Sequence, residues 1–222
     1  MARMPRLVVP GYPHHVTQRG NRRMKTFFSA ADYQVYLDLI CEVKEEIGVD
    51  IWAYCLMPNH THLVVVPQEP DGLSRLFRYV HRHYTRRINF REKWKGHLWQ
   101  ERFHSFVMDE NYLLATVRYV ELNPVRAALC IRPEEWEWSS ARAHLLRKDD
   151  GVVRVQPLLD RVDDWIRYLS TSTEITGAEL LEIRKHSRTG RPVGCESFIE
   201  TMELLTKRRL KKRKPGPKPV IK

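Results

Sequence analysis

The sequence of 222 residues lacks three features that would place it in large classes of protein. Its uninterrupted apolar runs, such as residues 51–57 and 63–67, are far shorter than the roughly 20 residues that a membrane-spanning helix needs. Before Pro10 the only apolar run is three residues long, so we expect no signal peptide. The four cysteines include no close pair, which argues against a disulfide framework and a cysteine-based zinc site. These absences favour a protein of the reducing cytoplasm, with no membrane partner.

The composition also excludes disorder for most of the chain. Hydrophobic residues make up 42% of the sequence, close to the average of globular proteins, and six tryptophans offer large surfaces for burial. A chain of this length forms one domain with an appendage, or two small domains.

The positive charge, a formal +11, is distributed in blocks. Residues 71–104 carry nine basic and three acidic side chains, and residues 206–222 carry nine basic and none acidic. Without those last residues the chain carries only +2. Basic blocks beside an acidic remainder are typical of proteins that bind a polyanion at one place, so we expect nucleic acid as the partner.

The first two thirds of the chain show a clear order of secondary-structure elements. Hydrophobic periodicity and turn residues predict a strand at 12–19, a helix at 30–47 between Ser29 and Gly48, a hairpin at 50–66, a helix at 71–91, a strand within 98–108 and a helix at 110–122. The order βαββαβ predicts an α+β fold, a ferredoxin-like antiparallel sheet with helices on one face and one additional helix. The other face of the sheet would then be open to a ligand.

The remainder of the chain has a different character. We predict a first domain over residues 1–145 and a helical region over 146–205, with helices at 157–169, from the capping-box signature at Thr176, and at 196–210. The tail, 206–222, is rich in Lys, Arg and Pro and is expected to be disordered and to bury nothing.

His60 and His62 are the sharpest chemical feature of the sequence. Residues two apart on a strand point to the same face, so both imidazoles can bind one ion while Thr61 faces away. Such a pair also occurs on strands by chance, and taken alone it is more often structural than metal-binding.

Tyr119 and Asn123 are a second candidate pair. On a helix, residues four apart share a face, and there a phenol nucleophile would lie beside a hard oxygen ligand. The alternative is a half-buried tyrosine and a helix end before Pro124.

Together these four residues resemble a known family. A His-x-His pair on a ferredoxin-like sheet, followed by a helix with Tyr-x-x-x-Asn, is similar to the single-tyrosine HUH nucleases, the fold and site of the small IS200-like tyrosine transposases. The segments Leu-Met-Pro-Asn-His-Thr-His-Leu-Val at 56–64, Leu-Trp-Gln-Glu-Arg-Phe at 98–103 and Arg-Tyr-Val-Glu-Leu-Asn-Pro-Val-Arg-Ala at 118–127 most resemble the REP-associated tyrosine transposases. The likeness covers about residues 5–145. Thr61 departs from the hydrophobic residue that the name HUH implies.

The resemblance implies an activity. Tyr119 would be the catalytic nucleophile of a single-stranded DNA endonuclease and strand transferase that cleaves near hairpin DNA through a 5′-phosphotyrosine. His60, His62 and Asn123 would hold Mg²⁺ or Mn²⁺. A second hypothesis is a noncatalytic DNA- or RNA-binding regulator on an RRM-like sheet. A hydrolytic metalloenzyme would need a further ligand and a base near the pair, and neither occurs locally.

Candidate DNA contacts are basic and less specific. They are Arg75, Arg78, Arg82 and Arg86 on the helix at 71–91, Arg19 and Arg102 beside the sheet, and Lys207, Arg208, Arg209, Lys211 and Lys212 in the tail. For the helix arginines a solvated surface is the equal alternative. Aromatic candidates for base stacking, among them Trp99 and Phe103, are more often core residues. We expect a cytoplasmic, nucleoid-associated protein, and both monomer and homodimer are open.

Overall fold

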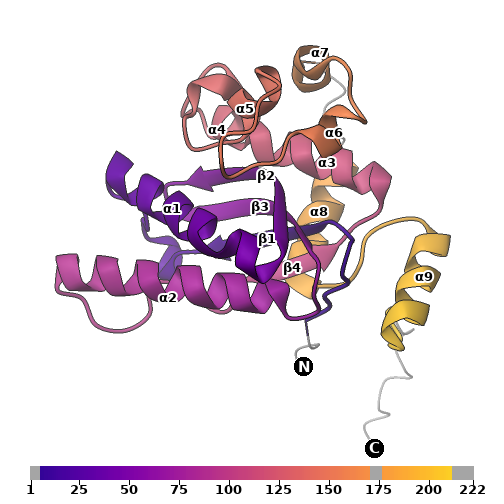
Figure 1. Cartoon of the computed structure of the whole chain (residues 1–222), viewed down its shortest axis with the longest axis horizontal. Helices are drawn as coiled ribbons and strands as arrows, with labels where there is room; N and C mark the ends of the chain where they lie inside the picture. Colours follow the sequence, from indigo (N-terminus) through magenta and orange to yellow (C-terminus); the bar gives the residue numbers. More distant parts are fainter. Residues whose placement is uncertain (1–5, 171–176, 212–222) are drawn as a thin grey trace, which may run out of the picture.

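The computed structural model describes residues 6–170 and 177–211. Its centre is a four-stranded antiparallel sheet in the order β2-β3-β1-β4, which Figure 1 shows from the β2 edge at the top to β4 below. The strands are β1 (His14–Arg19), β2 (Val49–Met57), β3 (His60–Pro67) and β4 (His104–Val107). The strand order and the two intervening helices confirm the predicted α+β, ferredoxin-like arrangement.

Local sequence signals set the limits of the first helix, α1 (Ala30–Ile47). Ser29 and Asp32 form a capping box, in which each side chain accepts a hydrogen bond from the other residue's backbone. Gly48 ends the helix at φ 72°, a left-handed conformation that glycine adopts without strain. The prediction for 30–47 is therefore confirmed at both ends.

The hairpin of β2 and β3 turns at Pro58-Asn59, as predicted. Its register pairs Met57 with His60 and Cys55 with His62, and β1 pairs Arg19 with His60 and Thr17 with His62. β3 is thus an inner strand, hydrogen-bonded on both edges, which holds its side chains in fixed positions.

The sheet is covered on both faces, which corrects the expectation of an open face. The helices α1 and α2 (Gly72–Glu92) pack against each other and against the hairpin. The opposite face of β2 and β3 is covered by α3 (Glu110–Glu121), and α8 (Gly177–Thr189) packs on β4, β1 and α3. Any ligand therefore has to enter beside α3 and not across a bare sheet.

The α3 helix begins at Asp109, whose Oδ1 accepts a hydrogen bond from the Tyr112 backbone at 3.0 Å. It stops at Glu121, and a separate short helix, α4 (Asn123–Arg126), begins with Pro124 in its first turn. The prediction that Asn123-Pro124 ends or weakens the helix is confirmed. The consequence is a correction, because Asn123 opens α4 and does not share one continuous helix with Tyr119.

The chain also contains several short helices, some of which pack against the sheet domain. They are η1 (Asn21–Arg23) after β1, and later η2 (Pro133–Glu135), α5 (Ala141–Leu145), α6 (Gln156–Leu159) and α7 (Trp165–Ser170). The single helix expected at 157–169 is wrong, since it is broken into α6 and α7. Residues from Val152 to Leu169 contribute to the same hydrophobic core as the sheet.

A buried carboxylate connects α3 to this region. Glu121 accepts hydrogen bonds from Ser140 Oγ at 2.6 Å, His144 Nδ1 at 2.7 Å and Trp165 Nε1 at 3.0 Å. A fully buried carboxylate requires such partners, because its desolvation is otherwise very costly. The helix that carries Tyr119 is therefore bound by side chains from two later segments, residues 140–144 and Trp165.

The last described helix, α9 (Glu196–Thr206), lies apart from the sheet at the side of the molecule (Figure 1). Thr176, predicted to cap α8, lies outside the described residues. Beyond α9 the chain folds back, and Leu210 is buried against Leu7, Val9 and Met202. The expectation that nothing after residue 206 is buried is thus wrong for Leu210.

No helix in residues 6–170 and 177–211 is long and apolar enough to span a membrane. The four cysteines carry free thiols.

Candidate active site

The predicted histidine pair lies on one face of β3, under α3. The ring centroids of His60 and His62 are 4.9 Å apart, and Thr61 between them faces the side of α1 and α2. The sequence prediction that both imidazoles share a face is confirmed. His62 is buried, whereas His60, at the start of the strand, is half-buried and closer to solvent.

Tyr119 projects from α3 onto this pair. Its ring centroid lies 5.4 Å from that of His62, with the two rings almost perpendicular. Tyr119 is 9% exposed, so its side chain is largely packed within the protein. The phenol and the two imidazoles, which come from elements more than 50 residues apart, therefore converge at one point.

Arg126 holds Tyr119 in place. Its Nη2 donates a hydrogen bond to the Tyr119 carbonyl at 2.7 Å, and its guanidinium lies 4.3 Å from the centroid of the phenol ring. Sequence reasoning missed this residue. The seven-residue spacing from Tyr119, two helical turns, was the only available signal, and the helix break at Leu122 weakens it.

Asn123 is buried at the start of α4, four residues after Tyr119. Its Nδ2 has no hydrogen-bond partner within the described residues. A buried amide nitrogen without a partner is uncommon in native proteins.

His15 is a further site residue that sequence reasoning missed. From β1 its Nε2 shares a hydrogen bond of 3.0 Å with His62 Nδ1, and the two rings are stacked. Its ring centroid also lies 6.2 Å from that of Tyr119. Only the strand register brings these residues together, because His15 precedes His62 by 47 positions.

The three imidazoles are neutral near pH 7. Burial lowers the pKa of His15 to about 3, and burial together with the Arg19 charge lowers that of His60 to about 4. The pKa of His62 is well below its ordinary value, because of burial first and of the neighbouring His60 and His15 second. Neutral rings keep the nitrogen lone pairs that a metal ion needs.

Hydrogen bonds decide which nitrogen of each ring stays available. His60 Nδ1 lies 2.6 Å from Asn59 Oδ1, an acceptor, so this nitrogen carries the proton and Nε2 carries the lone pair. His62 Nε2 is buried and has no partner among the residues that the structure describes. Among the same residues, no group of three or more His, Cys, Asp or Glu side chains is arranged to hold a metal ion by itself. The Asn123 amide is not one of these residue types.

The predicted basic residues are distributed over several surfaces. Arg19 lies beside the site, opposite His60. The pKa of its guanidinium is lowered, by burial first and by the Arg23 charge second, and Tyr119 partly opposes this shift. Arg102 is exposed in the loop before β4. Lys211 binds Glu196 and Glu200 of α9, Arg208 donates to the Arg6 carbonyl, and Lys212 lies outside the described residues.

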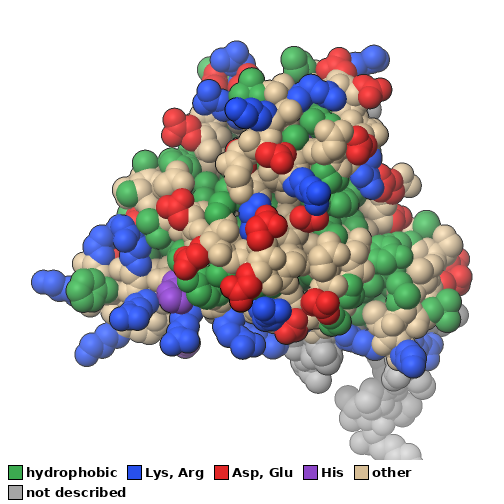
Figure 2. Space-filling model, in the orientation of Figure 1, with side chains coloured by type: hydrophobic (Ala, Val, Ile, Leu, Met, Phe, Trp, Pro, Cys, Tyr) green, Lys and Arg blue, Asp and Glu red, His purple; other side chains and the backbone are tan. Residues whose placement is uncertain are grey.

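The arginines of α2 lie on the helix face turned away from the core, on the opposite side of the sheet from Tyr119. Arg78, Arg82 and Arg86 are exposed and Arg75 is half-buried. Figure 2 shows Lys and Arg side chains gathered along the lower side of the molecule, where α2 runs in Figure 1. The stripe predicted from the sequence exists as a surface, but it does not lie directly over the histidines.

The antiparallel sheet, with its His-x-His pair under a tyrosine-bearing helix, has the arrangement expected from the sequence. Residues 9–123, just over half of the chain, match the family described as Transposase IS200 like. The chain belongs to this family of transposases, which confirms the resemblance drawn from the sequence.

Two individual proteins are similar to this chain. The REP-associated tyrosine transposase of Escherichia coli (strain K12) is 23% identical over 128 residues, which cover 57% of this chain and 74% of the relative. A solved structure of a REP-associated tyrosine transposase bound to a REP hairpin superposes with a TM-score of 0.57 at 22% identity. This match covers 69% of this chain and 89% of that one, and it supports the fold.

Proposed function

We propose that this transposase is a metal-dependent single-stranded DNA endonuclease and strand transferase that uses Tyr119 as its nucleophile. The convergence of the Tyr119 phenol with the rings of His60 and His62 carries the proposal. A protein that only bound nucleic acid would need neither a neutral histidine pair nor a phenol fixed beside it.

Hairpin DNA is the proposed substrate. The similar solved protein is bound to a REP hairpin, and the E. coli relative is named a REP-associated tyrosine transposase. Arg19 and Arg102 beside the sheet and the exposed arginines of α2 would neutralise DNA phosphates.

The donor set of the site fits a divalent cation. His60 Nε2 and His62 Nε2 are the available ring nitrogens, and Asn123 would add a hard amide oxygen. Two imidazoles, an amide oxygen and no thiolate suit Mn²⁺ or Mg²⁺ with positions left for a phosphate. When bound, such an ion would polarise a phosphate oxygen and offset the charge that develops in the transition state.

His15 would set the tautomer of His62. For His62 Nε2 to offer a lone pair, the proton of this neutral ring must lie on Nδ1. His62 Nδ1 then donates to His15 Nε2 across the 3.0 Å contact. His15 is a positioning residue in this scheme, as the second partners of metal-binding histidines commonly are.

The reaction needs one nucleophile and a phosphodiester. The Tyr119 oxygen forms a bond to phosphorus, the bond from phosphorus to the 3′ oxygen breaks, and the leaving oxygen takes up a proton to become a free 3′-hydroxyl. The phenol loses its own proton in the same step. The 5′-phosphotyrosine retains the bond energy, so a second 3′-hydroxyl can reverse the reaction onto another strand without ATP.

A denaturing gel tests the proposal. The protein is incubated with Mn²⁺ and a labelled single-stranded oligonucleotide that carries a hairpin, and covalent DNA–protein adduct is quantified after denaturation. We expect an adduct from the wild type and from the control variant Tyr79→Phe, whose tyrosine lies on α2, and none from Tyr119→Phe. An adduct that survives Tyr119→Phe, or its absence with every hairpin tested, would favour the noncatalytic regulator.

A further inference from the structure

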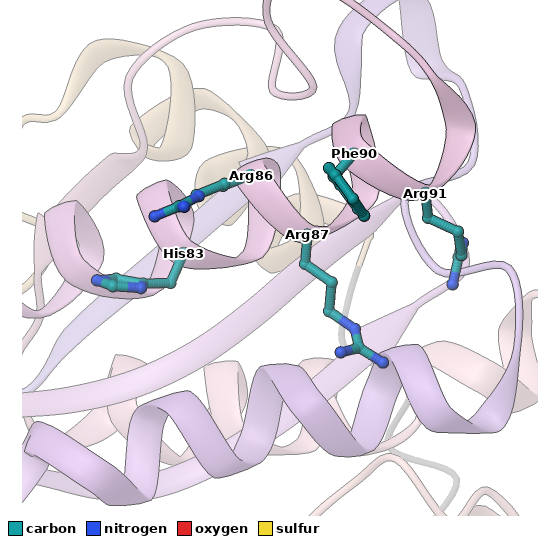
Figure 3. A pocket seen from close by; sticks show the side chains of 5 residues that line it. All are labelled: His83, Arg86, Arg87, Phe90 and Arg91. Atoms are coloured by element: carbon teal, nitrogen blue, oxygen red, sulfur yellow. The ribbon is translucent and has the colours of Figure 1, made fainter.

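The exposed end of α2 carries an unusual combination of side chains. Phe90 is 88% exposed, and it lines a shallow, open depression of about 600 Å³ together with His83, Arg86, Arg87 and Arg91. In Figure 3 the Phe90 ring lies between Arg86 and Arg91 along the helix, and the Arg87 side chain extends below it. The described residues that line this depression include no carboxylate.

The arginines of the depression differ in whether they are bound by a carboxylate. Arg91 is bound by Asp32 at 2.5 Å and by Glu92 at 2.6 Å, which neutralises the two carboxylates nearest to it. Arg86 and Arg87 form no ion pair within the described part of the chain and are exposed. Their charge is therefore available to an anion from solution.

Two more aromatic side chains extend the surface. Phe28 and Trp94 are 41% and 39% exposed, with ring centroids 5.7 Å apart, and the Arg91 guanidinium lies 5.5 Å from the Phe28 centroid. We call Phe28, Phe90, Trp94, Arg86 and Arg87 the aromatic–basic cluster. By contrast, Trp99 and Phe103, the stacking candidates from the sequence, are buried in the core.

The cluster lies at the same end of the sheet as the candidate active site. The Arg23 carbonyl accepts a hydrogen bond from Asn59 Nδ2 at 3.0 Å, and Asn59 in turn contacts His60. The backbone N–H groups of Thr26 and Phe27 donate to the Pro58 carbonyl. From Arg23 to Phe28 the chain spans at most about 18 Å, so Phe28 lies near the end of the sheet at which His60 begins β3.

We propose that the aromatic–basic cluster binds unpaired nucleotides of the DNA strand that enters the site of Tyr119, with a base stacked on Phe90 and phosphates on Arg86 and Arg87. The proposal rests on the proposed function for the identity of that strand. Exposed rings beside cations suit single-stranded nucleic acid, because the bases of a duplex are already stacked on each other.

Binding by the full-length Tyr119→Phe protein tests this surface without cleavage. Fluorescence anisotropy with a labelled oligonucleotide, a hairpin with a single-stranded extension, gives the dissociation constant. We expect Phe90→Ala to weaken binding at least about fivefold, since stacking on one ring contributes about 1–3 kcal/mol. Phe90→Trp should retain wild-type affinity. Ile131→Ala is the matched control, because Ile131 is 87% exposed and belongs to another surface.

An abasic scan identifies the nucleotide. An abasic nucleotide at one position of the extension should weaken binding by the protein that retains Phe90. The same nucleotide should leave binding by Phe90→Ala unchanged. Affinity of Phe90→Ala equal to that of Ile131→Ala would overturn the proposal, and so would an equal loss on a blunt duplex. The absence of an adduct from the wild type would instead refute the proposed function and leave the binding result intact.

Discussion

The site under α3 and the basic surface of α2 use opposite physical means. The first consists of buried, neutral rings held by a strand register, in which His15, His62 and Tyr119 contact one another. The second consists of exposed arginines whose side chains are free to adjust. Groups of the first kind act over a few ångströms and depend on position, whereas charges of the second kind act over about a Debye length and depend on salt.

The comparison implies a separation of roles. Changes under α3 should alter metal binding and chemistry with little effect on DNA affinity, and changes on α2 should do the reverse. A variant that altered both properties equally would show that the two regions form one site.

Loss of a ligand histidine should have the largest effect. In His60→Ala we expect no detectable cleavage and a fall in Mn²⁺ affinity of more than roughly 100-fold. This fall exceeds the roughly 10–100-fold that is typical when a residue hydrogen-bonded to a metal ligand is removed. DNA affinity should change less than about twofold. Calorimetric Mn²⁺ titration and the adduct assay measure the first two, and the exposed His97→Ala is the control. If DNA binding falls in parallel with cleavage, the histidines are structural.

Removing the partner of a ligand should have a smaller effect. His15→Phe keeps a ring on β1 but offers no acceptor to His62 Nδ1, so Mn²⁺ affinity should fall about 10–100-fold. His15→Gln, which can accept that hydrogen bond, should recover part of the loss. Nitrogen-15 NMR of the His62 ring reports the tautomer directly. An unchanged tautomer in His15→Phe would contradict the assigned role.

Lowering the pH should destabilise the fold through its buried histidines. His14 Nε2 accepts a hydrogen bond from the Val9 backbone at 3.1 Å, and burial lowers the pKa of His14 to about 4. The unfolded chain takes up this proton near pH 6.5 and the folded chain only near pH 4. The free energy of unfolding should therefore decline by up to about 3 kcal/mol as the pH falls through that interval.

Denaturant unfolding at several pH values measures this decline. The decline should persist at high salt, because the His14 ring is shielded from the solvent. In His14→Phe the slope of the unfolding free energy against pH should decrease by the equivalent of about one proton taken up on unfolding. An unaltered slope would show that His14 does not titrate on unfolding.

The smallest effect is expected from the end of the chain. A protein truncated after Lys211 keeps Leu210 in its core position and removes five basic residues. We expect weaker DNA binding at low salt. The slope of log affinity against log salt concentration should also become shallower, by up to about one for each DNA phosphate that these residues neutralise. Anisotropy titrations across salt concentrations measure both. A loss of adduct at saturating DNA would show that the tail also acts in the chemistry.

Much of the fold was predictable because its signals are local. Ser29, Gly48, the Pro58-Asn59 turn and Asp109 each mark the end of an element with residues a few positions apart. The pairing of His60 with His62 followed from the two-residue period of a strand. The broken helix at 157–169 and the buried Leu210 were missed, because tertiary packing determined both.

The partners of the site were not predictable from spacing alone. The contact of His15 with His62 depends on the register between β1 and β3, and the position of Tyr119 depends on which face α3 covers. Phe90 gave no signal, because an apolar residue in a helix is more often buried than exposed.

The sequence by itself determined the order of elements and the family, and it supplied the proposed nucleophile and histidine pair, since these depend on residue type and short-range spacing. Only the tertiary structure decided that α3 closes the second face of the sheet, that His15 partners His62, and that the arginines of α2 lie away from Tyr119. These relations join residues far apart in the chain, and the packing of the sheet against its helices selects them.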